Sequence, residues 1–260
     1  EEFTLTLSGG GTVTTTNAFT LNDPSSVLAF KGIKQISAVA VTGELSSGML
    51  SVENDALIQT FSHDGSSRLD ISNDTTLTVQ NLFEVPQNKS MELLGTDNGT
   101  LILGDQLILS GILKFSAADT LSGGTLALKG GTLTVNENAE IITNITHLAD
   151  SGISVFLDKT LKYSGATPNV GAFTLTLFGG GKFENTKDIT LNDPLSVLVL
   201  NGINVSKVSF AEELSTGKLS VSSDSLIETL SQNVSSRLDI VSGVRLTLEN
   251  SFEIPDETTM

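Results

Sequence analysis

The fold of this chain follows from a phrase that occurs twice in it. Residues 3–11 read FTLTLSGGG and residues 173–181 read FTLTLFGGG, so the two copies are related by an offset of 170. The same offset relates LNDPSSVL at 21–28 to LNDPLSVL, and after a one-residue deletion an offset of 169 relates SSRLDI at 66–71 to a second SSRLDI. Copies this similar indicate an architecture built from repeated units.

A weaker third copy lies between these two. GTL at 99–101 aligns with GTV at 11–13, and ILKF at 112–115 aligns with VLAF at 27–30. The repeat unit is therefore about 85 residues long, and alternate units resemble each other most. We expect one continuous assembly over residues 1–260, with units at approximately 1–88, 89–171 and 172–260.

Within each unit the pattern is that of β-strands. Apolar and polar residues alternate, which is typical of strands with one buried face. Turn-forming pairs such as Asn98-Gly99 and Gly130-Gly131 separate the runs, and corresponding strands recur about every 20 residues. The expected strands include 3–7, 77–79, 124–128, 131–135, 218–221 and 245–248, and only 139–148 is ambiguous between strand and helix.

Two all-β architectures fit short strands at this spacing. One is a string of tandem β-sandwich domains of about 85 residues, and the other is a parallel β-helix (β-solenoid) whose coils of roughly 20 residues stack on each other. We favour the solenoid, because short insertions are absorbed between copies, no Pro- or Ser-rich linker separates the units, and GGTL recurs at 123 and 130. About 13 coils, each about 4.8 Å from the next, would make a rod of about 60 Å.

Composition excludes several classes of partner. The 260 residues include 14 Lys plus Arg and 30 Asp plus Glu, a formal net charge of −16, which argues against binding to nucleic acid or to anionic lipid. A hydrophobic content of 38% with a mean hydropathy of +0.14 is too apolar for a disordered chain. No cysteine is present, so disulfides, thiolate nucleophiles and Cys-type metal sites are excluded.

Both ends of the chain fall inside the repeat pattern. Met260 aligns with Met91, which continues without a break, and Glu1 aligns with Gly171 inside a continuing segment. Solenoid ends normally carry polar capping repeats. We therefore expect either a segment of a longer array or a subunit that stacks end to end.

The chain resembles a known group of proteins at the level of pattern. The phrase GGTLTV at 130–135, the absence of Cys, the low content of Lys and Arg and the turns rich in Ser, Thr and Asn are similar to the right-handed parallel β-helix passengers of bacterial autotransporters and related secreted surface adhesins. The resemblance implies an extracellular or cell-surface location and a structural or adhesive role. It supplies no catalytic residue, because no catalytic motif of those families is matched.

One charged motif is repeated. In SSRLDI, Arg68 and Asp70 are two residues apart and so share a strand face, as do Arg237 and Asp239. These pairs could be repeated contact points along the rod, but we favour solvent-exposed ion pairs that contribute well under about 1 kcal/mol.

The acidic residues invite a comparison with calcium sites. Neither an Asp-x-Asp-x-Asp-Gly loop nor the calcium β-roll nonapeptide occurs, so we interpret the scattered acids as turn and solubility residues. Those acids include Asp23, Glu53, Asp55, Asp193 and Asp224. His63 and His147 are single histidines without a nucleophile motif. We predict no catalytic, cofactor-binding or metal-binding residues.

The leading hypothesis is a non-enzymatic repeat segment of a long bacterial surface protein, acting as adhesin stalk, filament or sheath component. Its partners would be further copies packed end to end or laterally, the rest of a longer chain, or the surface of a host or neighbouring cell. A β-helix polysaccharide lyase or hydrolase is the alternative, but three Arg, one Tyr and no Trp do not favour it. Ice binding would need regular rows of Thr, and the Thr-x-Thr phrases are sporadic.

Overall fold

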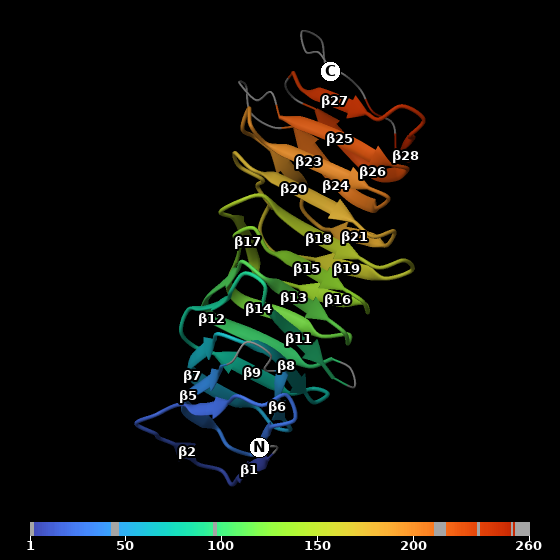
Figure 1. The fold of residues 1–260 in the computed structure, drawn as a ribbon. Helices are drawn as coiled ribbons and strands as arrows, with labels where there is room; N and C mark the ends of the chain where they lie inside the picture. The colour runs from blue at the N-terminus through green and yellow to red at the C-terminus, as the bar shows by residue number, and fades with distance from the viewer. Residues whose placement is uncertain are drawn as a thin grey trace.

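The computed structural model describes residues 3–42, 47–95, 98–210, 217–232, 235–250 and 252. In these residues the chain is all-β, and its strands stack into a rod with β1 at one end and β27 at the other (Figure 1). The described residues form no helix, so this part of the chain has no helical segment that could cross a membrane.

The strands form two sheets. The first sheet has twelve strands, in the spatial order β1 (Thr4–Ser8), β4 (Val27–Lys31), β6 (Ser47–Val52), β8 (Ser66–Ile71), β11 (Ser90–Leu94), β13 (Ile112–Phe115), β15 (Thr132–Val135), β18 (Ser151–Val155), β20 (Thr174–Phe178), β23 (Val197–Asn201), β25 (Lys218–Ser223) and β27 (Arg237–Ile240).

The second sheet has sixteen strands. Its main path is β2 (Thr12–Val13), β5 (Gln35–Val41), β7 (Ala56–His63), β9 (Thr76–Val79), β12 (Thr100–Leu109), β14 (Thr120–Leu128), β16 (Ala139–Ile141), β19 (Thr160–Tyr163), β21 (Lys182–Asn185), β24 (Asn204–Phe210), β26 (Ser225–Gln232) and β28 (Leu246–Leu248). Beside this path β3 (Phe19–Leu21) pairs with β5, β10 (Phe83–Val85) with β12, β17 (Asn144–His147) with β14, and β22 (Ile189–Leu191) with β24.

Each turn in the described residues contributes one strand to the first sheet and one or two strands to the second. Neighbouring strands are parallel, as between β6 and β8, where Leu50 lies beside Leu69. The β-solenoid prediction is therefore confirmed, and the tandem β-sandwich alternative is wrong. The prediction of about 13 coils is too high, because the spacing between paired residues ranges from 19, at Leu50 and Leu69, to 24, at Leu69 and Leu93.

The sequence repeats coincide with whole turns of the solenoid. β1 and β20, which carry the two FTLTL phrases, are eight positions apart along the first sheet. β4 and β13, which carry the weaker match, are four positions apart. The offset of 170 thus corresponds to eight turns, and one repeat unit comprises four turns. The boundaries of the units at 88 and 171 remain a prediction from the sequence.

The expected strands are present, and the ambiguous stretch is resolved. Residues 139–148 form β16 and β17, because Ala139, Ile141 and Ile145 all point into the interior. Asn98 and Gly130 have positive φ angles of 60° and 82°, as their turn-forming pairs predict. The sequence FEIP at 252–255, which repeats FEVP at 83–86 at the offset of 169, lies outside the described residues except for Phe252.

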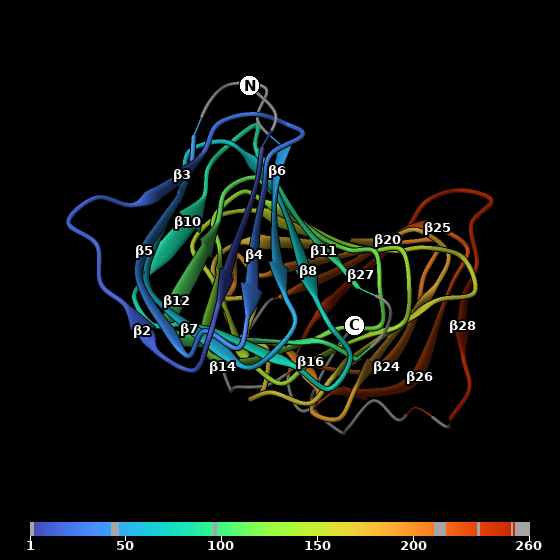
Figure 2. The same ribbon diagram turned by 90° about the horizontal axis from the view of Figure 1, so that it is seen from below.

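The two sheets enclose one continuous apolar core. Figure 2 views the rod from its lower end and shows β4, β6 and β8 of the first sheet across from β5, β7 and β12 of the second. Alternate residues of each strand point inward, so Leu69 and Ile71 are buried while Arg68 and Asp70 are only half-buried. The largest fully buried side chains are those of Tyr163, Phe30, Phe115, Phe183 and Phe210. Because the core extends through all the turns, each turn depends on its neighbours for burial.

The repeated phrase provides a matched test of this dependence. Leu177 of β20 is buried between turns, whereas its counterpart Leu7 of β1 is half-buried on the end turn. Leu177→Ala should cost about 2–5 kcal/mol of unfolding free energy, as is usual for a buried Leu, and Leu7→Ala should cost about 1 kcal/mol or less. Urea denaturation followed by circular dichroism would measure both. Equal costs would mean that the two turns are equally covered.

Candidate functional site

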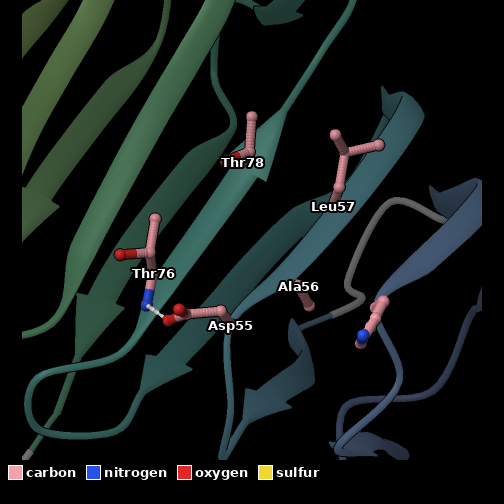
Figure 3. A pocket seen from close by; sticks show the side chains of 6 residues that line it. Asp55, Ala56, Leu57, Thr76 and Thr78 are labelled. Atoms are coloured by element: carbon pink, nitrogen blue, oxygen red, sulfur yellow. Dashed lines mark hydrogen bonds between the residues drawn. The ribbon is translucent and has the colours of Figure 1, made fainter. Parts of the chain in front are cut away.

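The surface hollows of the described residues are shallow, and each lies across neighbouring turns. Figure 3 shows the hollow over β7 and β9, which has a volume of about 450 Å³. It is lined by Lys34, Asp55, Ala56, Leu57, Thr76 and Thr78. Its one carboxylate is already engaged, because Asp55 Oδ1 accepts a hydrogen bond of 2.9 Å from the backbone N–H of Thr76. This hollow holds neither a pair of carboxylates nor a nucleophile beside a base.

Two further hollows have the same character. In one, Glu84 Oε1 accepts a 2.6 Å hydrogen bond from Ser110 and lies 3.6 Å from Lys129 Nζ. In the other, Glu140 Oε1 lies 3.7 Å from Lys162 Nζ. Each carboxylate is neutralised by a cation from a later turn. Such groups stabilise the contact between turns and are poorly placed to act as general acids or bases.

Ion pairs between turns recur along the rod. The pairs join Lys31 to Glu53, Lys114 to Glu92, Lys159 to Glu137, Lys162 to Glu140 and Lys218 to Asp239, with N···O distances between 2.6 and 3.7 Å. At Glu92, burial alone would raise the carboxyl pKa, but hydrogen bonds from Lys114 and Ser116 outweigh it, and the pKa lies below its ordinary value. Several of the scarce cations thus bind acids on adjacent turns.

The repeated Arg and Asp residues lie on the outer face of the first sheet, as predicted, but their contacts differ. Arg237 forms an ion pair with Asp239 at 3.2 Å, and hydrogen bonds from Lys218 and Arg237 lower the pKa of that carboxyl. Arg68 instead donates a 3.1 Å hydrogen bond to the carbonyl oxygen of Pro24, two turns earlier in the chain. The motif therefore makes different local contacts in its two copies.

The scattered acids act mainly as backbone acceptors at turns. Asp23 Oδ1 accepts from the N–H of Ser25, and Asp193 Oδ1 accepts from Leu195 in the same way. Asp224 Oδ1 accepts from the N–H of Arg245 on the next turn at 2.8 Å, which repeats the Asp55 contact. Glu53 pairs with Lys31. Within the described ranges no group of three or more His, Cys, Asp or Glu side chains is arranged to hold a metal ion.

His63 is buried in the second sheet beside Phe61. Its Nε2 lies 2.7 Å from Ser67 Oγ, and burial lowers its pKa to about 4. Burial also lowers the pKa of His147 to about 4. Both histidines are therefore neutral at physiological pH and act as packing residues.

Sequence reasoning missed three polar residues that shape the interior. Tyr163 is fully buried, donates a 2.7 Å hydrogen bond to the carbonyl of Ala166 and accepts one from the N–H of Ile145. Asn185 donates to the carbonyls of Lys187 and Lys207. Asp119 is fully buried and accepts a 3.0 Å bond from the N–H of Gly99. The only sequence signal for these residues is the alternation of apolar and polar residues, which assigns inward positions to Tyr163 and Asn185.

The buried state of His63 makes stability depend on pH. The unfolded chain takes up a proton near the ordinary histidine pKa of about 6.5, whereas the folded chain does so only near 4. This group therefore leaves stability unchanged above pH 6.5 and lowers it by about 3 kcal/mol as the pH falls from 6.5 to 4.

The equivalent position of the later repeat, at an offset of 169, holds the buried Gln232. His63→Gln should remove about 2–3 kcal/mol of the loss in stability between about pH 7.5 and about pH 4.5, and Gln232→His should add a similar loss. Urea denaturation at the two pH values would measure this, and a wild-type pH dependence in His63→Gln would contradict it.

The Asp55 contact can be tested in the same way. Asp55→Ala should cost about 1 kcal/mol, because the N–H of Thr76 loses its acceptor, and Asp55→Asn should be nearly neutral, because it keeps an oxygen there. Thermal unfolding of both variants, with and without millimolar calcium chloride, would measure this. A rise in Tm with calcium that disappears in Asp55→Asn would show that the carboxylate binds a cation instead.

Comparison of the chain with protein-family models, with curated proteins and with solved structures found no match.

Proposed function

We propose that this chain is a non-enzymatic structural repeat segment of a long bacterial extracellular surface protein, acting as adhesin stalk, filament or sheath component. The observation that carries the proposal is the single apolar core, whose buried residues run from Leu21 to Leu230 without a break between turns. A core of this kind gives a rod without hinges. Rigid spacing is what a stalk or a filament requires.

The contacts between turns support this mechanical role. Parallel backbone ladders join every pair of adjacent strands in the first sheet, so their hydrogen bonds point along the rod. With strands about 4.8 Å apart, twelve strands extend over about 50 Å. Ion pairs such as Lys114 with Glu92 add contacts in the same direction. A force along the rod is therefore shared by many parallel bonds.

The net charge favours a solvent-exposed rod that is repelled by neighbouring rods. A charge of −16 keeps such molecules apart in solution and disfavours nucleic acid and membrane surfaces as partners. Partners would be further copies of the chain, the remainder of a longer polypeptide, or the surface of a host or neighbouring cell. An extracellular location fits the resemblance to autotransporter passengers at the level of pattern.

The proposed role predicts the shape of the purified chain and its location in the native source. Small-angle X-ray scattering of the purified chain should give the distance distribution of a rigid rod. In the native source, an antibody against the chain should label intact cells, and protease treatment of intact cells should remove the signal. Labelling only after the cells are broken open would contradict the surface location.

The alternative hypothesis, a β-helix polysaccharide lyase or hydrolase, has its own test. The purified chain should release neither unsaturated oligosaccharides nor reducing ends from a panel of acidic and neutral glycans. The hollow in Figure 3 is the best place to challenge this expectation, since Lys34 and Asp55 both line it. Cleavage that is lost in Asp55→Asn would replace the structural proposal with an enzymatic one.

A further inference from the structure

The outer face of the second sheet changes in character along the rod. Near the start of β5, β7, β9, β12 and β14, which are neighbours in this sheet, ten outward side chains are half-buried and none is Asp, Glu, Lys or Arg. We call these ten residues the uncharged face. They are Gln35, Ser37, Leu57, Gln59, Thr76, Thr78, Thr100, Ile102, Thr120 and Ser122.

Strand pairing orders the uncharged face into rows. One row consists of Gln35, Leu57, Thr78, Ile102 and Ser122, in that order along the rod. Beside it, β9, β12 and β14 contribute one Thr each to a second row. Figure 3 shows the two threonines of β9 next to Leu57 of β7. The centre of the face is therefore Thr78, which has an apolar side chain on each side and hydroxyl and amide groups around it.

The later repeat copy carries charges where the first copy has none. At five positions on or beside the outer face of the second sheet, the offsets of 170 and 169 equate an uncharged residue with a charged one. The charged residues are Lys182, Glu184, Lys207, Glu228 and Arg245, in place of Thr12, Thr14, Ala38, Gln59 and Thr76.

The charged copy shows what the fold accepts at these positions. Lys182 forms ion pairs with Glu184 at 3.5 Å and with Glu228 at 2.7 Å, and the strands of the two copies pair in the same way. Charge on this face is therefore compatible with folding. Its absence from the first copy needs a reason other than stability of the solenoid.

Contact with an identical face supplies such a reason. In a two-fold contact both copies use the same patch, so residues near the axis meet their own kind. A charged group there would face a like charge, whereas a hydroxyl or a carboxamide both donates and accepts and can pair with itself. The net charge of −16 opposes the approach of two copies, and an uncharged face keeps like charges out of the centre of the contact.

The size of the face sets the strength of such a contact. Five strands about 4.8 Å apart cover about 24 Å along the rod, and five residues of about 3.3 Å each cover about 17 Å across it. The resulting area of about 400 Å² per copy is about half of what each partner buries in a standard interface. The contact should therefore be weak, with a Kd of about 0.1 to 1 mM.

From these observations we infer that the uncharged face binds the same face of a second copy of this chain, in a side-by-side dimer whose two-fold axis passes near Thr78. Leu57 and Ile102 form the apolar centre of the contact, and the surrounding Thr, Ser and Gln side chains form its polar rim. Lys34 and Asp55, which border the face, have opposite signs. The inference rests on the proposed structural role, because it names the lateral partner for a filament or sheath.

Sedimentation equilibrium of the purified chain from about 10 µM to about 1 mM, at low and high salt, tests the inference. The average mass should rise from 27.3 kDa towards twice that value as the concentration increases. The rise should be larger at high salt, because salt screens the repulsion between the net charges. Contact through the ion pairs of the later copy would instead weaken as salt is added.

The repeat provides matched variants. Leu57 and Leu226 are equivalent and half-buried, and Thr78 is equivalent to Thr247. Leu57→Lys and Thr78→Lys should each weaken association more than about tenfold, whereas Leu226→Lys and Thr247→Lys should leave it unchanged. The double change Gln59→Glu and Thr76→Arg introduces residues that the later copy already carries, so it should keep the fold by circular dichroism and weaken association.

Cross-linking locates the axis. The chain has no cysteine, so Thr78→Cys introduces a single thiol at the centre of the uncharged face. Oxidation of two such thiols by a copper phenanthroline reagent should give a disulfide-linked dimer on non-reducing gels. Thr247→Cys places the thiol on the later copy and should remain largely monomeric under the same conditions.

Three results would overturn the inference. They are a wild-type chain that stays monomeric at about 1 mM in high salt, equal weakening by the first-copy and later-copy variants, and equal cross-linking of the two Cys variants. A monomeric chain that binds a soluble glycan, and loses it in Thr78→Lys, would replace the second copy with carbohydrate as the occupant of the face. The labelling and scattering tests of the proposed function do not depend on association, so the two can fail separately.

Discussion

Each turn of this protein is stable only because another turn lies against it. A single turn has one strand in the first sheet and one or two in the second, and the backbone N–H and C=O groups of these strands pair with strands on the turns above and below. Its inward Leu, Val and Phe side chains are likewise covered only in a stack. The difference between Leu177, which is fully buried, and Leu7, which is not, shows this dependence within one repeated phrase.

The polar residues follow the same constraint. Asp55 holds the backbone of the next turn at its first strand residue and Asp224 holds it one residue before the strand, and pairs such as Lys159 with Glu137 join turns at the surface. Most of the carboxylates that were considered as candidate calcium ligands form these contacts instead. A surface built in this way offers a partner shape and charge along its length.

The interior is not wholly apolar, and its polar groups have consequences. His63 remains neutral because burial lowers its pKa to about 4, which links folding to acidity. Tyr163 and Asn185 satisfy backbone groups where the second sheet divides into short strands, as it does between β21 and β22. Such residues stabilise irregular corners that pure alternation of apolar and polar residues would leave unbonded.

The sequence by itself determined the strands, the stacking of turns and the equivalence of the repeats. Alternation assigns Leu69 and Ile71 inward and Arg68 outward, and the offset of 170 equates β1 with β20, because both signals are local or periodic. Only the tertiary structure decided the division into two sheets, the unequal lengths of the turns and the choice of ion-pair partners. Those depend on which residues lie above one another after each turn closes. Adding or removing one or two residues in a turn changes which residues lie above one another, and it does so without altering the strand pattern.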